Sequence, residues 1–392
     1  MSVSLIGCGC SPESLTREAA AAIDRAELLI GAARLLAPYQ REKRCAAATA
    51  AGDIAAILAA EPETEACVLF SGDSGFYSGA RLLLPLLKEE PALLPGIASV
   101  QVFAARLRES WQDWRLCSAH GVSCDPVAKV CCGEKTFFLT GGRTGPDALC
   151  RRLTEAGLGF LPVAVGERLG YEDERLIRTT AEEASNMRFA SLSVLLAEAA
   201  PRLKARTPGL PDGDFVRDEN IPMTKQELRA VILSKLAVGP EDCCWDIGAG
   251  TGSVAVELAL QAGAVWGVER SEAALALAEQ NRRRFGAWNL RLVSGSAPAA
   301  LAGLPAPDAV FVGGSGGKLR EILEAVHTAN PAARVCVSAI ALETLETARA
   351  VLKAHGMRPE ICQISVSRGR DAGGLTMMTA LNPVWLIVGR PT

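Results

Sequence analysis

The sequence has few of the residues that build metal or redox centres. It contains only three histidines, and none of its thirteen cysteines belongs to a C-x-x-C pair. An odd number of cysteines, with adjacent pairs at Cys131-Cys132 and Cys243-Cys244, is typical of a reducing compartment and not of a disulfide framework. We therefore expect no metal site, and we expect most of the cysteines to be small buried hydrophobic residues.

Long apolar runs and an excess of positive charge are also absent. No uninterrupted apolar run reaches the roughly 18 residues that a membrane helix needs, and the N-terminus lacks the pattern of a signal peptide. The formal net charge is -3 and the pI is about 5.9, so no global positive field attracts nucleic acid or an anionic membrane. These absences predict a cytoplasmic protein that binds neither nucleic acid nor a membrane.

The length and the residue pattern indicate two α/β domains. At 392 residues the chain is too long for one ordinary core. Strand-like and helical runs alternate through the first half, which predicts a layered α/β architecture. The strand-like runs lie at 3–6, 67–70, 100–103 and 135–140, and the helical runs lie at 15–25 and 80–88. The alternation stops between Pro201 and Pro222, where Pro, Gly and Asp accumulate. We predict domains at 1–204 and 218–392, joined by a linker at 205–217.

The second half has the pattern of a doubly wound, Rossmann-like sheet. A helix at 224–236 precedes a strand at 243–247, and a helix at 253–262 follows it. Further strand-like segments lie at 264–269, 290–293, 309–312 and 334–338. Two long β-like segments, at 360–367 and 377–388, then predict a terminal hairpin.

The most informative motif of the second half is a glycine-rich strand-to-helix turn. It reads Asp246-Ile247-Gly248-Ala249-Gly250-Thr251-Gly252-Ser253, and Glu269 ends the next predicted strand. Glycines allow a tight turn and close ligand approach, and a carboxylate at the second position can accept hydrogen bonds from ribose hydroxyls. A turn that binds nothing would not require that carboxylate. The D-x-G-x-G-x-G spacing resembles the first motif of class I S-adenosylmethionine-dependent methyltransferases, whereas nicotinamide sites favour G-x-G-x-x-G.

A second glycine-rich loop lies in the first half. The residues Ser71-Gly72-Asp73-Ser74-Gly75-Phe76-Tyr77-Ser78 follow a predicted strand and precede a predicted helix. Open parallel sheets bind ligands at this position, where glycine amides and short polar side chains are available. A tight turn with an N-capping serine is the alternative explanation.

Taken together, these motifs resemble two families that act on corrin rings. In the first half, Gly7-Cys8-Gly9, the 71–78 loop, Pro95-Gly96-Ile97-Ala98-Ser99-Val100 and Gly170-Tyr171-Glu172-Asp173-Glu174-Arg175 resemble the tetrapyrrole methylases, and among them the carbon-5 corrin methyltransferases. In the second half, the Asp246 motif, Gly295-Ser296-Ala297-Pro298 and the run from Pro307 to Gly317 resemble the decarboxylating carbon-15 methyltransferases. The resemblance covers nearly the whole chain, and it implies a fused pair.

The implied activity is methylation of the macrocycle at carbons 5 and 15, with loss of carbon dioxide from the acetate on carbon 12. The implied cofactor is S-adenosylmethionine, with one site per domain, and the family tends to form homo-oligomers. The resemblance implies a two-subdomain tetrapyrrole methylase fold for the first half and places these residues near the cofactor: Gly7, Gly9, Gly72, Asp73, Ser74, Tyr77, Ser78, Ser99 and Thr140, with Gly166 as a further candidate. In the second half the implied contacts are Asp246, Gly248, Gly250, Gly252, Glu269, Gly295, Ser296 and Ala297.

Two positions depart from the family pattern. An acidic residue commonly stands where this chain has Ser296, so backbone groups would have to hold the adenine. An arginine is expected where the chain has Val122.

The implied substrate carries several carboxylates, and planar arginines are their natural partners. Arg368 and Arg370 lie between the two final β-like segments, where a mobile loop could close over a large ligand. The loop Gly313-Gly314-Ser315-Gly316-Gly317 leads into a helix expected near Lys318, and its amides could hold an anion. A solvated hairpin loop and a plain tight turn are the respective alternatives.

No catalytic side chain can be named from the sequence. An electron-rich ring carbon needs no protein nucleophile, so positioning would supply most of the catalysis, up to roughly 7–11 kcal/mol in well-aligned systems. Two other functions stay open at this point. One is a two-domain nicotinamide-dependent oxidoreductase, which the glycine spacing opposes, and the other is a tetrapyrrole- or nucleotide-binding module without turnover.

Overall fold

The computed structural model describes residues 3–122, 124–142, 144–201 and 208–391. The chain forms two compact units. Unit 1 comprises Met1–Cys124, Glu134–Glu155 and Gly159–Glu198, and unit 2 comprises Asp125–Gly133, Ala156–Leu158 and Ala199–Thr392. The predicted domain end at 204 and the linker residues 205–207 lie outside the described residues, so the predicted division stays a prediction.

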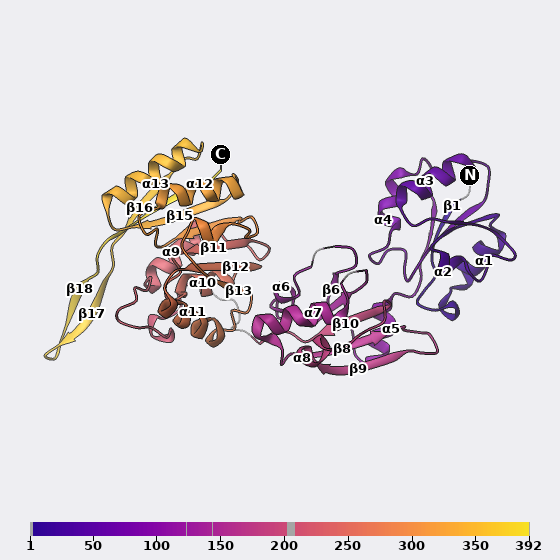
Figure 1. The fold of residues 1–392 in the computed structure, drawn as a ribbon, viewed down its shortest axis with the longest axis horizontal. Coiled ribbons are helices and arrows are strands. Elements are labelled where there is room, and N and C mark those ends of the chain that lie inside the picture. The colour runs from indigo at the N-terminus through magenta and orange to yellow at the C-terminus, as the bar shows by residue number, and fades with distance from the viewer. Residues whose placement is uncertain (1–2, 123, 143, 202–207, 392) are drawn as a thin grey trace. The chain divides into compact units, whose positions relative to one another are not determined.

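Unit 1 contains two five-stranded sheets (Figure 1). The first is wholly parallel in the order β3-β2-β4-β1-β5. Its strands are β1 (Val3–Gly7), β2 (Leu28–Gly31), β3 (Arg44–Ala47), β4 (Ala66–Phe70) and β5 (Ala92–Leu94). The second has the order β6-β7-β10-β8-β9, with only β6 and β7 parallel. Its strands are β6 (Arg115–Ser118), β7 (Thr136–Leu139), β8 (Pro162–Glu167), β9 (Arg175–Thr180) and β10 (Ser193–Ala197).

Short helices connect these strands. They are α1 (Arg17–Arg25), α2 (Ala33–Leu36), α3 (Ala51–Ala60), α4 (Ala80–Leu83), α5 (Ser99–Leu107), α6 (Pro126–Val130), α7 (Pro146–Leu153) and α8 (Ala181–Ser185). The helix α1 begins where the Thr16 side chain accepts a hydrogen bond from the Ala19 amide, a normal N-cap.

The prediction of a strand at 100–103 is wrong, because these residues belong to α5. Val100, Phe103, Ala104 and Leu107 are all buried, and their spacing of three and four residues is that of one helix face. The Gln101 side chain also accepts a hydrogen bond from the Ala98 amide at the helix start. The strand of this region is the short β5, which precedes the helix.

Unit 2 is built on a seven-stranded sheet in the order β13-β12-β11-β14-β15-β19-β16. The first five strands in this order pair in parallel, and β19 lies antiparallel between β15 and β16. The strands are β11 (Cys243–Ile247), β12 (Ala264–Glu269), β13 (Leu290–Ser294), β14 (Ala309–Val312), β15 (Arg334–Ala339), β16 (Glu360–Ile364) and β19 (Val384–Gly389). The helices are α9 (Gln226–Leu236), α10 (Ser253–Ala259), α11 (Glu272–Arg284), α12 (Leu319–Ala329) and α13 (Leu342–Ala354). The predicted doubly wound arrangement is therefore confirmed.

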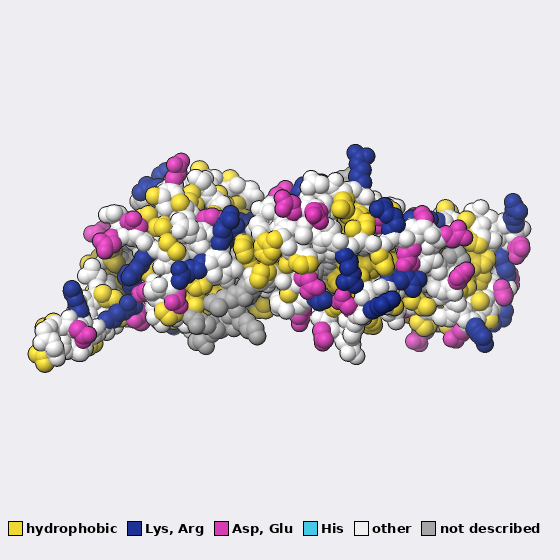
Figure 2. All heavy atoms as spheres, turned by 90° about the horizontal axis from the view of Figure 1, so that it is seen from below, with side chains coloured by type: hydrophobic (Ala, Val, Ile, Leu, Met, Phe, Trp, Pro, Cys, Tyr) yellow, Lys and Arg dark blue, Asp and Glu magenta, His cyan; other side chains and the backbone are white. Residues whose placement is uncertain are grey.

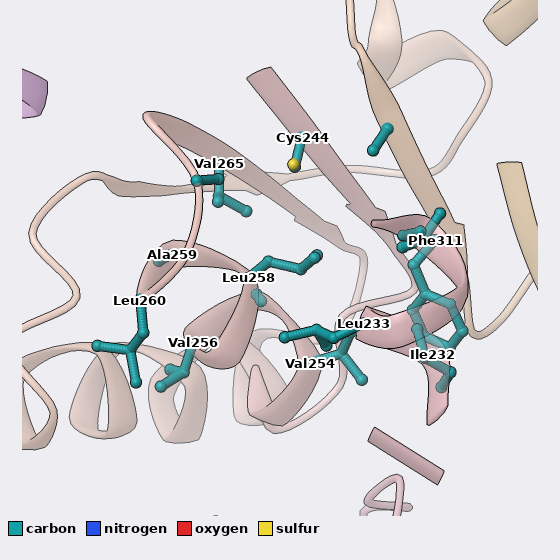
Figure 3. Close-up of a cluster of buried hydrophobic side chains, with 14 of the residues drawn as sticks. Ile232, Leu233, Cys244, Val254, Val256, Leu258, Ala259, Leu260, Val265 and Phe311 are labelled. Carbon is teal, nitrogen blue, oxygen red and sulfur yellow. The ribbon is translucent and has the colours of Figure 1, made fainter. Parts of the chain in front are cut away.

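Apolar clusters bury both faces of this sheet. One cluster joins Ile232 and Leu233 of α9 to several side chains of α10 and to Cys244, Val265 and Phe311 of the sheet (Figure 3). The other packs α12 and α13 against the opposite face, around Trp245 and Ile247. Because β11 is central and buried, its end at Ile247 is held rigidly. This rigid strand fixes where the loop after it begins.

The terminal hairpin is longer than predicted, and Arg368 lies in a strand and not in a loop. The residues after β16 form β17 (Ser367–Ala372), which pairs with β18 (Leu375–Ala380) as a two-stranded ribbon (Figure 1). β16 and β19 form the base of the same hairpin within the main sheet. Arg368 and Arg370 are thus strand residues, which corrects the expected loop.

The described part of the predicted linker packs against unit 2. Leu210 and Phe215 are buried in the same apolar cluster as Ile232 and Leu233, and the amides of Gly209 and Leu210 donate to the carboxylate of Glu257 on α10. Arg229 on α9 is fully buried and joins this segment through Asp212 and the Leu210 carbonyl. We call residues 208–224 the entry segment.

Charged side chains of both signs are mixed on the surface. On the face in Figure 2, lysines and arginines alternate with aspartates and glutamates, and neither sign forms a continuous stripe. Among the described residues, the structure contains no helix long and apolar enough to span a membrane.

Candidate functional site

The predicted cofactor residues of unit 2 meet at the carboxyl edge of its sheet. Ile247 at the end of β11 is paired with Val268 of β12 on one side and with Val312 of β14 on the other. Glu269 at the end of β12 is paired with Ser294 of β13. The loops after these four strands therefore share one edge. The strand order changes direction between β11 and β14, which is where open α/β sheets bind ligands.

The glycine loop after β11 follows a path that side chains would block. Gly248, Gly250 and Gly252 all have positive φ angles, of 75°, 55° and 74°. A Cβ on Gly248 would lie 2.6 Å from the Gly314 nitrogen, and one on Gly252 would lie 2.9 Å from the Ala278 Cβ. The amides of Gly313 and Gly314 donate to the Ile247 carbonyl. The two predicted loops, one for the cofactor and one for the substrate, thus form a single cradle.

Glu269 links the cradle to the loop after β12. One carboxylate oxygen accepts from the Gly250 amide at 3.0 Å, and the other accepts from the amides of Arg270 and Ser271 at 2.8 and 2.9 Å. The side chain is half-buried. Its orientation is therefore fixed by backbone groups, and a carboxylate has further lone pairs that can accept from a ligand hydroxyl.

Asp246 lies beneath the loop and is almost fully buried, with 1% of its surface exposed. Among the residues that the structure describes, neither of its carboxylate oxygens has a hydrogen-bond partner. Burial raises the pKa of Asp246 to about 7; the nearby Ala255 amide lowers this pKa, and the charge of Glu269 raises it further. The hydroxyl of Thr251 is also buried without a partner. A buried carboxyl without a hydrogen-bond partner is stabilised when a hydrogen-bond donor or a positive charge comes close to it.

The predicted adenine-side residues lie beside Glu269. The Gly295 amide donates to the Glu269 carbonyl at 3.0 Å, and Gly295 has a φ of 153°, which favours glycine. Ser296 is exposed, and Ala297 is buried in the cluster that contains Trp245. The Ser296 hydroxyl donates weakly to the Ala297 carbonyl at 3.4 Å. The cradle, Glu269 and this loop fit an adenosyl group, while the assignment of each residue to it stays a prediction.

Sequence reasoning missed Asn281, which anchors the glycine loop. Asn281 on α11 is fully buried and donates to the carbonyls of Thr251 and Val216, both at 2.9 Å. Its carboxamide oxygen accepts from the Val216 amide at 2.7 Å. Asn281 therefore joins the glycine loop to the entry segment. A polar residue on the buried face of a helix was the available signal in the sequence.

Arg368 already has carboxylate partners within unit 2. Its guanidinium lies 2.9 Å from Asp212 and also pairs with Glu227, so two acidic side chains compete with any ligand for it. These partners hold the pKa of Arg368 above its usual value. Among the described residues, the structure shows no ion pair for Arg370, which is exposed on β17. Their predicted role toward substrate carboxylates stays a prediction.

In unit 1 the predicted glycines meet at the carboxyl edge of the first sheet. Gly9 and Gly72 form a two-way backbone bridge, with N–H to O distances of 3.0 and 2.8 Å. A Cβ on Gly7 would lie 2.6 Å from the Gly96 nitrogen and 2.8 Å from the Gly72 oxygen. The ends of β1, β4 and β5 are therefore packed backbone to backbone. This crowding explains why three separate loops each carry a glycine.

Asp73 and Ser74 hold these loops together from within. The Asp73 carboxylate accepts from the Gly75 amide at 2.9 Å and from the Gly96 amide at 3.0 Å. The buried Ser74 hydroxyl donates to the Leu94 carbonyl at 3.2 Å. Both side chains thus have structural partners, and a direct contact with a cofactor stays a prediction for each.

The other predicted residues of unit 1 lie in two places. Tyr77 has a φ of 47° and donates its hydroxyl to the Leu116 carbonyl at 2.8 Å, while the Ser78 hydroxyl accepts from the Ala80 amide at the start of α4. Ser99 begins α5. Thr140 is buried after β7, in the second sheet, and donates to the Ser193 carbonyl at 2.5 Å. In the same sheet, a Cβ on Gly166 would lie 2.7 Å from the Phe103 ring.

Two protein-family models match the chain, one in each half. Residues 2–185 match the model of the tetrapyrrole (corrin/porphyrin) methylases, and residues 214–389 match that of a precorrin methyltransferase domain. The chain is 32% identical, over 325 residues, to a protein of Sinorhizobium sp named precorrin-6Y C(5,15)-methyltransferase (decarboxylating). That alignment covers 81% of this chain and 78% of the relative.

Shorter relatives match about half of the chain. A protein of Pyrobaculum calidifontis, named probable cobalt-precorrin-6B C(15)-methyltransferase (decarboxylating), is 44% identical over 185 residues, which are 46% of this chain and 95% of that protein. A crystal structure named precorrin-6Y C5,15-methyltransferase from Geobacter metallireducens is 35% identical. It covers 47% of this chain and 100% of its own, with a TM-score of 0.45.

Proposed function

Because the chain belongs to the family of precorrin-6Y C5,15-methyltransferases (decarboxylating), we propose that it converts precorrin-6B to precorrin-8X in cobalamin biosynthesis. This conversion methylates the ring at carbons 5 and 15 and removes carbon dioxide from the acetate on carbon 12. The observation that carries the proposal is the cradle in unit 2, where Gly248 and Gly314 meet beside Glu269 at the point where the strand order changes.

The enzyme is a methyltransferase of an S-adenosylmethionine-dependent family, and we propose one cofactor site in each unit. In unit 2 the glycine loop 248–252 would hold the methionine part, Glu269 the ribose and residues 295–297 the adenine. In unit 1 the loops that carry Gly7, Gly72 and Ser99 would form the second site. Each unit has its own parallel sheet, and a glycine-rich loop lies at the carboxyl edge of each sheet. Because such loops offer backbone amides to a ligand, they support one cofactor site in each unit.

The residues of unit 2 would act mainly by positioning. When bound, S-adenosylmethionine supplies an electrophilic methyl group on sulfur. Glu269, whose orientation is fixed by three amides, would set the ribose, and the glycine loop would bring the methyl group toward the loop at 313–317. Holding the ring carbon in line with that methyl group makes the step effectively unimolecular, worth up to roughly 7–11 kcal/mol. No protein nucleophile is needed.

Asp246 would stabilise a positive charge bound nearby. Its carboxyl is about half protonated near neutral pH, because burial raises its pKa to about 7. A bound positive charge nearby would favour its ionised form and would be stabilised by it in turn. For decarboxylation, the conjugated ring can accept the electron pair, provided that the protein desolvates the departing carboxylate while its other carboxylates stay paired.

A nicotinamide-dependent oxidoreductase is not favoured. The D-x-G-x-G-x-G spacing of the glycine loop and the family assignment of both halves favour methyl transfer instead. We further propose that the enzyme is a cytoplasmic homo-oligomer that binds no nucleic acid. The mixed surface charges support the last point, and light scattering after size exclusion measures the oligomeric state.

The proposed function is tested by incubating the full chain with S-adenosylmethionine and precorrin-6B. We expect a product whose mass has gained two methyl groups and lost one carbon dioxide, with release of two equivalents of S-adenosylhomocysteine. Gly248→Ala should abolish only the carbon-15 methylation and the decarboxylation. A product without added methyl groups, or a change that needs NADH, would contradict the proposal.

A further inference from the structure

Arg270 reaches from one loop of the candidate site of unit 2 to another. It follows Glu269 directly, and its amide is fixed by a hydrogen bond of 2.8 Å to the Glu269 carboxylate. The residue is exposed, and its Nη1 atom lies 3.5 Å from the position that a Cβ would take on Gly316. Its backbone thus belongs to the loop after β12, while its guanidinium lies at the loop after β14.

The order of strands shows where this side chain lies. β12 and β14 are the two neighbours of β11, one on each side. A side chain that starts after β12 and ends beside the loop after β14 connects the two sides of β11. The glycine loop 248–252 begins at the carboxyl end of β11. The guanidinium of Arg270 therefore lies at the same edge of the sheet as the cradle.

The charge of Arg270 is available to a ligand. Within the described ranges, no carboxylate forms an ion pair with its guanidinium. Arg368, which sequence reasoning favoured, differs because Asp212 and Glu227 already bind it. A solvent-exposed guanidinium, next to a loop with no side chain at Gly316 or Gly317, can offer two parallel N–H donors to a carboxylate.

We propose that Arg270 binds a carboxylate of the tetrapyrrole substrate and determines how the ring enters unit 2. This inference rests on the proposed function, because it takes the substrate to be an anionic macrocycle. The carboxylate of the cofactor's methionine part has the same chemistry. The substrate is favoured because the Arg270 side chain is exposed, whereas Asp246 and Thr251 of the cofactor motif are buried.

The test compares Arg270→Ala and Arg270→Lys with the wild-type full chain. Steady-state decarboxylation of the precorrin gives KM, and calorimetry gives the Kd of S-adenosylhomocysteine. We expect Arg270→Ala to raise KM for the precorrin by about tenfold or more, which corresponds to about 1.4 kcal/mol. The KM of Arg270→Lys should lie between those of the wild type and Arg270→Ala, because lysine keeps the charge but lacks the planar guanidinium. The Kd of S-adenosylhomocysteine should stay unchanged.

Arg284→Ala is the matched control. Arg284 is exposed at the other end of α11, a helix of 13 residues and therefore roughly 20 Å long. The substitution Arg284→Ala removes the same charge from the same unit, and we expect it to leave KM unchanged. Thermal melting of each variant checks that the fold is intact.

Three results would overturn the inference, and they differ from one another. An unchanged KM in Arg270→Ala would show that the guanidinium binds no substrate carboxylate. A weaker Kd for S-adenosylhomocysteine, with unchanged binding of 5′-methylthioadenosine, would assign Arg270 to the cofactor's carboxylate instead. An absence of turnover in the wild type would contradict the proposed function itself, and the inference would fall with it.

Discussion

Gly248 and Gly314 are packed backbone to backbone, so that a Cβ on Gly248 would lie 2.6 Å from both the nitrogen and the oxygen of Gly314. The two glycines belong to the loops after β11 and β14, the adjacent strands where the strand order changes direction. This contact joins the predicted cofactor loop to the predicted substrate loop. A substitution at Gly248 should therefore affect both functions.

Gly248→Ala should abolish cofactor binding to unit 2. The positive φ of 75° costs a residue with a Cβ about 1–2 kcal/mol, and the overlap with Gly314 adds to this cost. Titration with S-adenosylhomocysteine should lose one site. Gly213→Ala is the control, because Gly213 has no positive φ and no atom near its Cβ position. Equal binding by both variants would contradict the cradle.

The buried carboxyl of Asp246 should make unit 2 less stable as the pH rises. Its pKa is about 7 in the folded state and near 3.8 when exposed, so between these values the folded protein holds a proton that the unfolded chain has released. The free energy of unfolding must then fall from about pH 4 to about pH 7. Asp246→Asn removes this titration. Urea unfolding, followed by the tryptophan fluorescence to which the buried Trp245 contributes, should show a flatter pH dependence in the variant. Parallel curves for the two proteins would count against the raised pKa.

Arg229 should be essential for the stability of unit 2. It is fully buried between Asp212 and Glu257, so Arg229→Ala would leave the buried Glu257 without a charged partner and Asp212 with Arg368 alone. We expect a loss of about 3–5 kcal/mol in the free energy of unfolding. Arg283→Ala serves as the comparison. Its ion pair with Glu279 is exposed and should contribute less than about 1 kcal/mol. Similar losses in the two variants would show that the buried ion pairs of Arg229 contribute no more to stability than the exposed pair of Arg283.

The isolated C-terminal half should need the entry segment in order to fold and to bind its cofactor. A fragment of residues 208–392 keeps Leu210, Asp212 and Phe215, and we expect it to unfold cooperatively and to bind one S-adenosylhomocysteine. A fragment of residues 218–392 loses these contacts and exposes the apolar cluster that they cover. Circular dichroism and calorimetry compare the two fragments. Full binding by the shorter one would show that the entry segment is a spacer.

The sequence predicted the strands of unit 2 well, and the loops that it singled out meet at one edge of the sheet, for a physical reason. Buried parallel strands are continuous apolar runs, and glycines with a carboxylate at fixed spacing mark the edge where the loops gather. The window at 100–103 predicts a strand wrongly, because its three apolar residues Val100, Val102 and Phe103 fit either period in so short a segment. The full length of the helix at Ser99–Leu107, with Leu107 as the fourth buried position, resolves the ambiguity.

Side-chain partnerships over long sequence separations could not be predicted. The Asp73 carboxylate accepts from the Gly75 and Gly96 amides, and the sequence did not indicate the partnership with Gly96; the predicted cofactor contact of Asp73 stays a prediction. Arg368 looked like a free guanidinium, but a residue 156 positions away binds it. One signal was available: Glu257 is the only charged residue of α10, whose seven described residues are all buried, and a charge there requires a buried partner. That partner is Arg229.

The most direct test of this account is the number of S-adenosylhomocysteine molecules that the full chain binds in a calorimetric titration. We predict two, with one lost in Glu269→Ala and the other lost in Asp73→Ala, because each substitution disturbs the loops of one sheet only. A wild-type stoichiometry of one or none, or the loss of both sites in a single variant, would contradict the claim that each half holds its own cofactor.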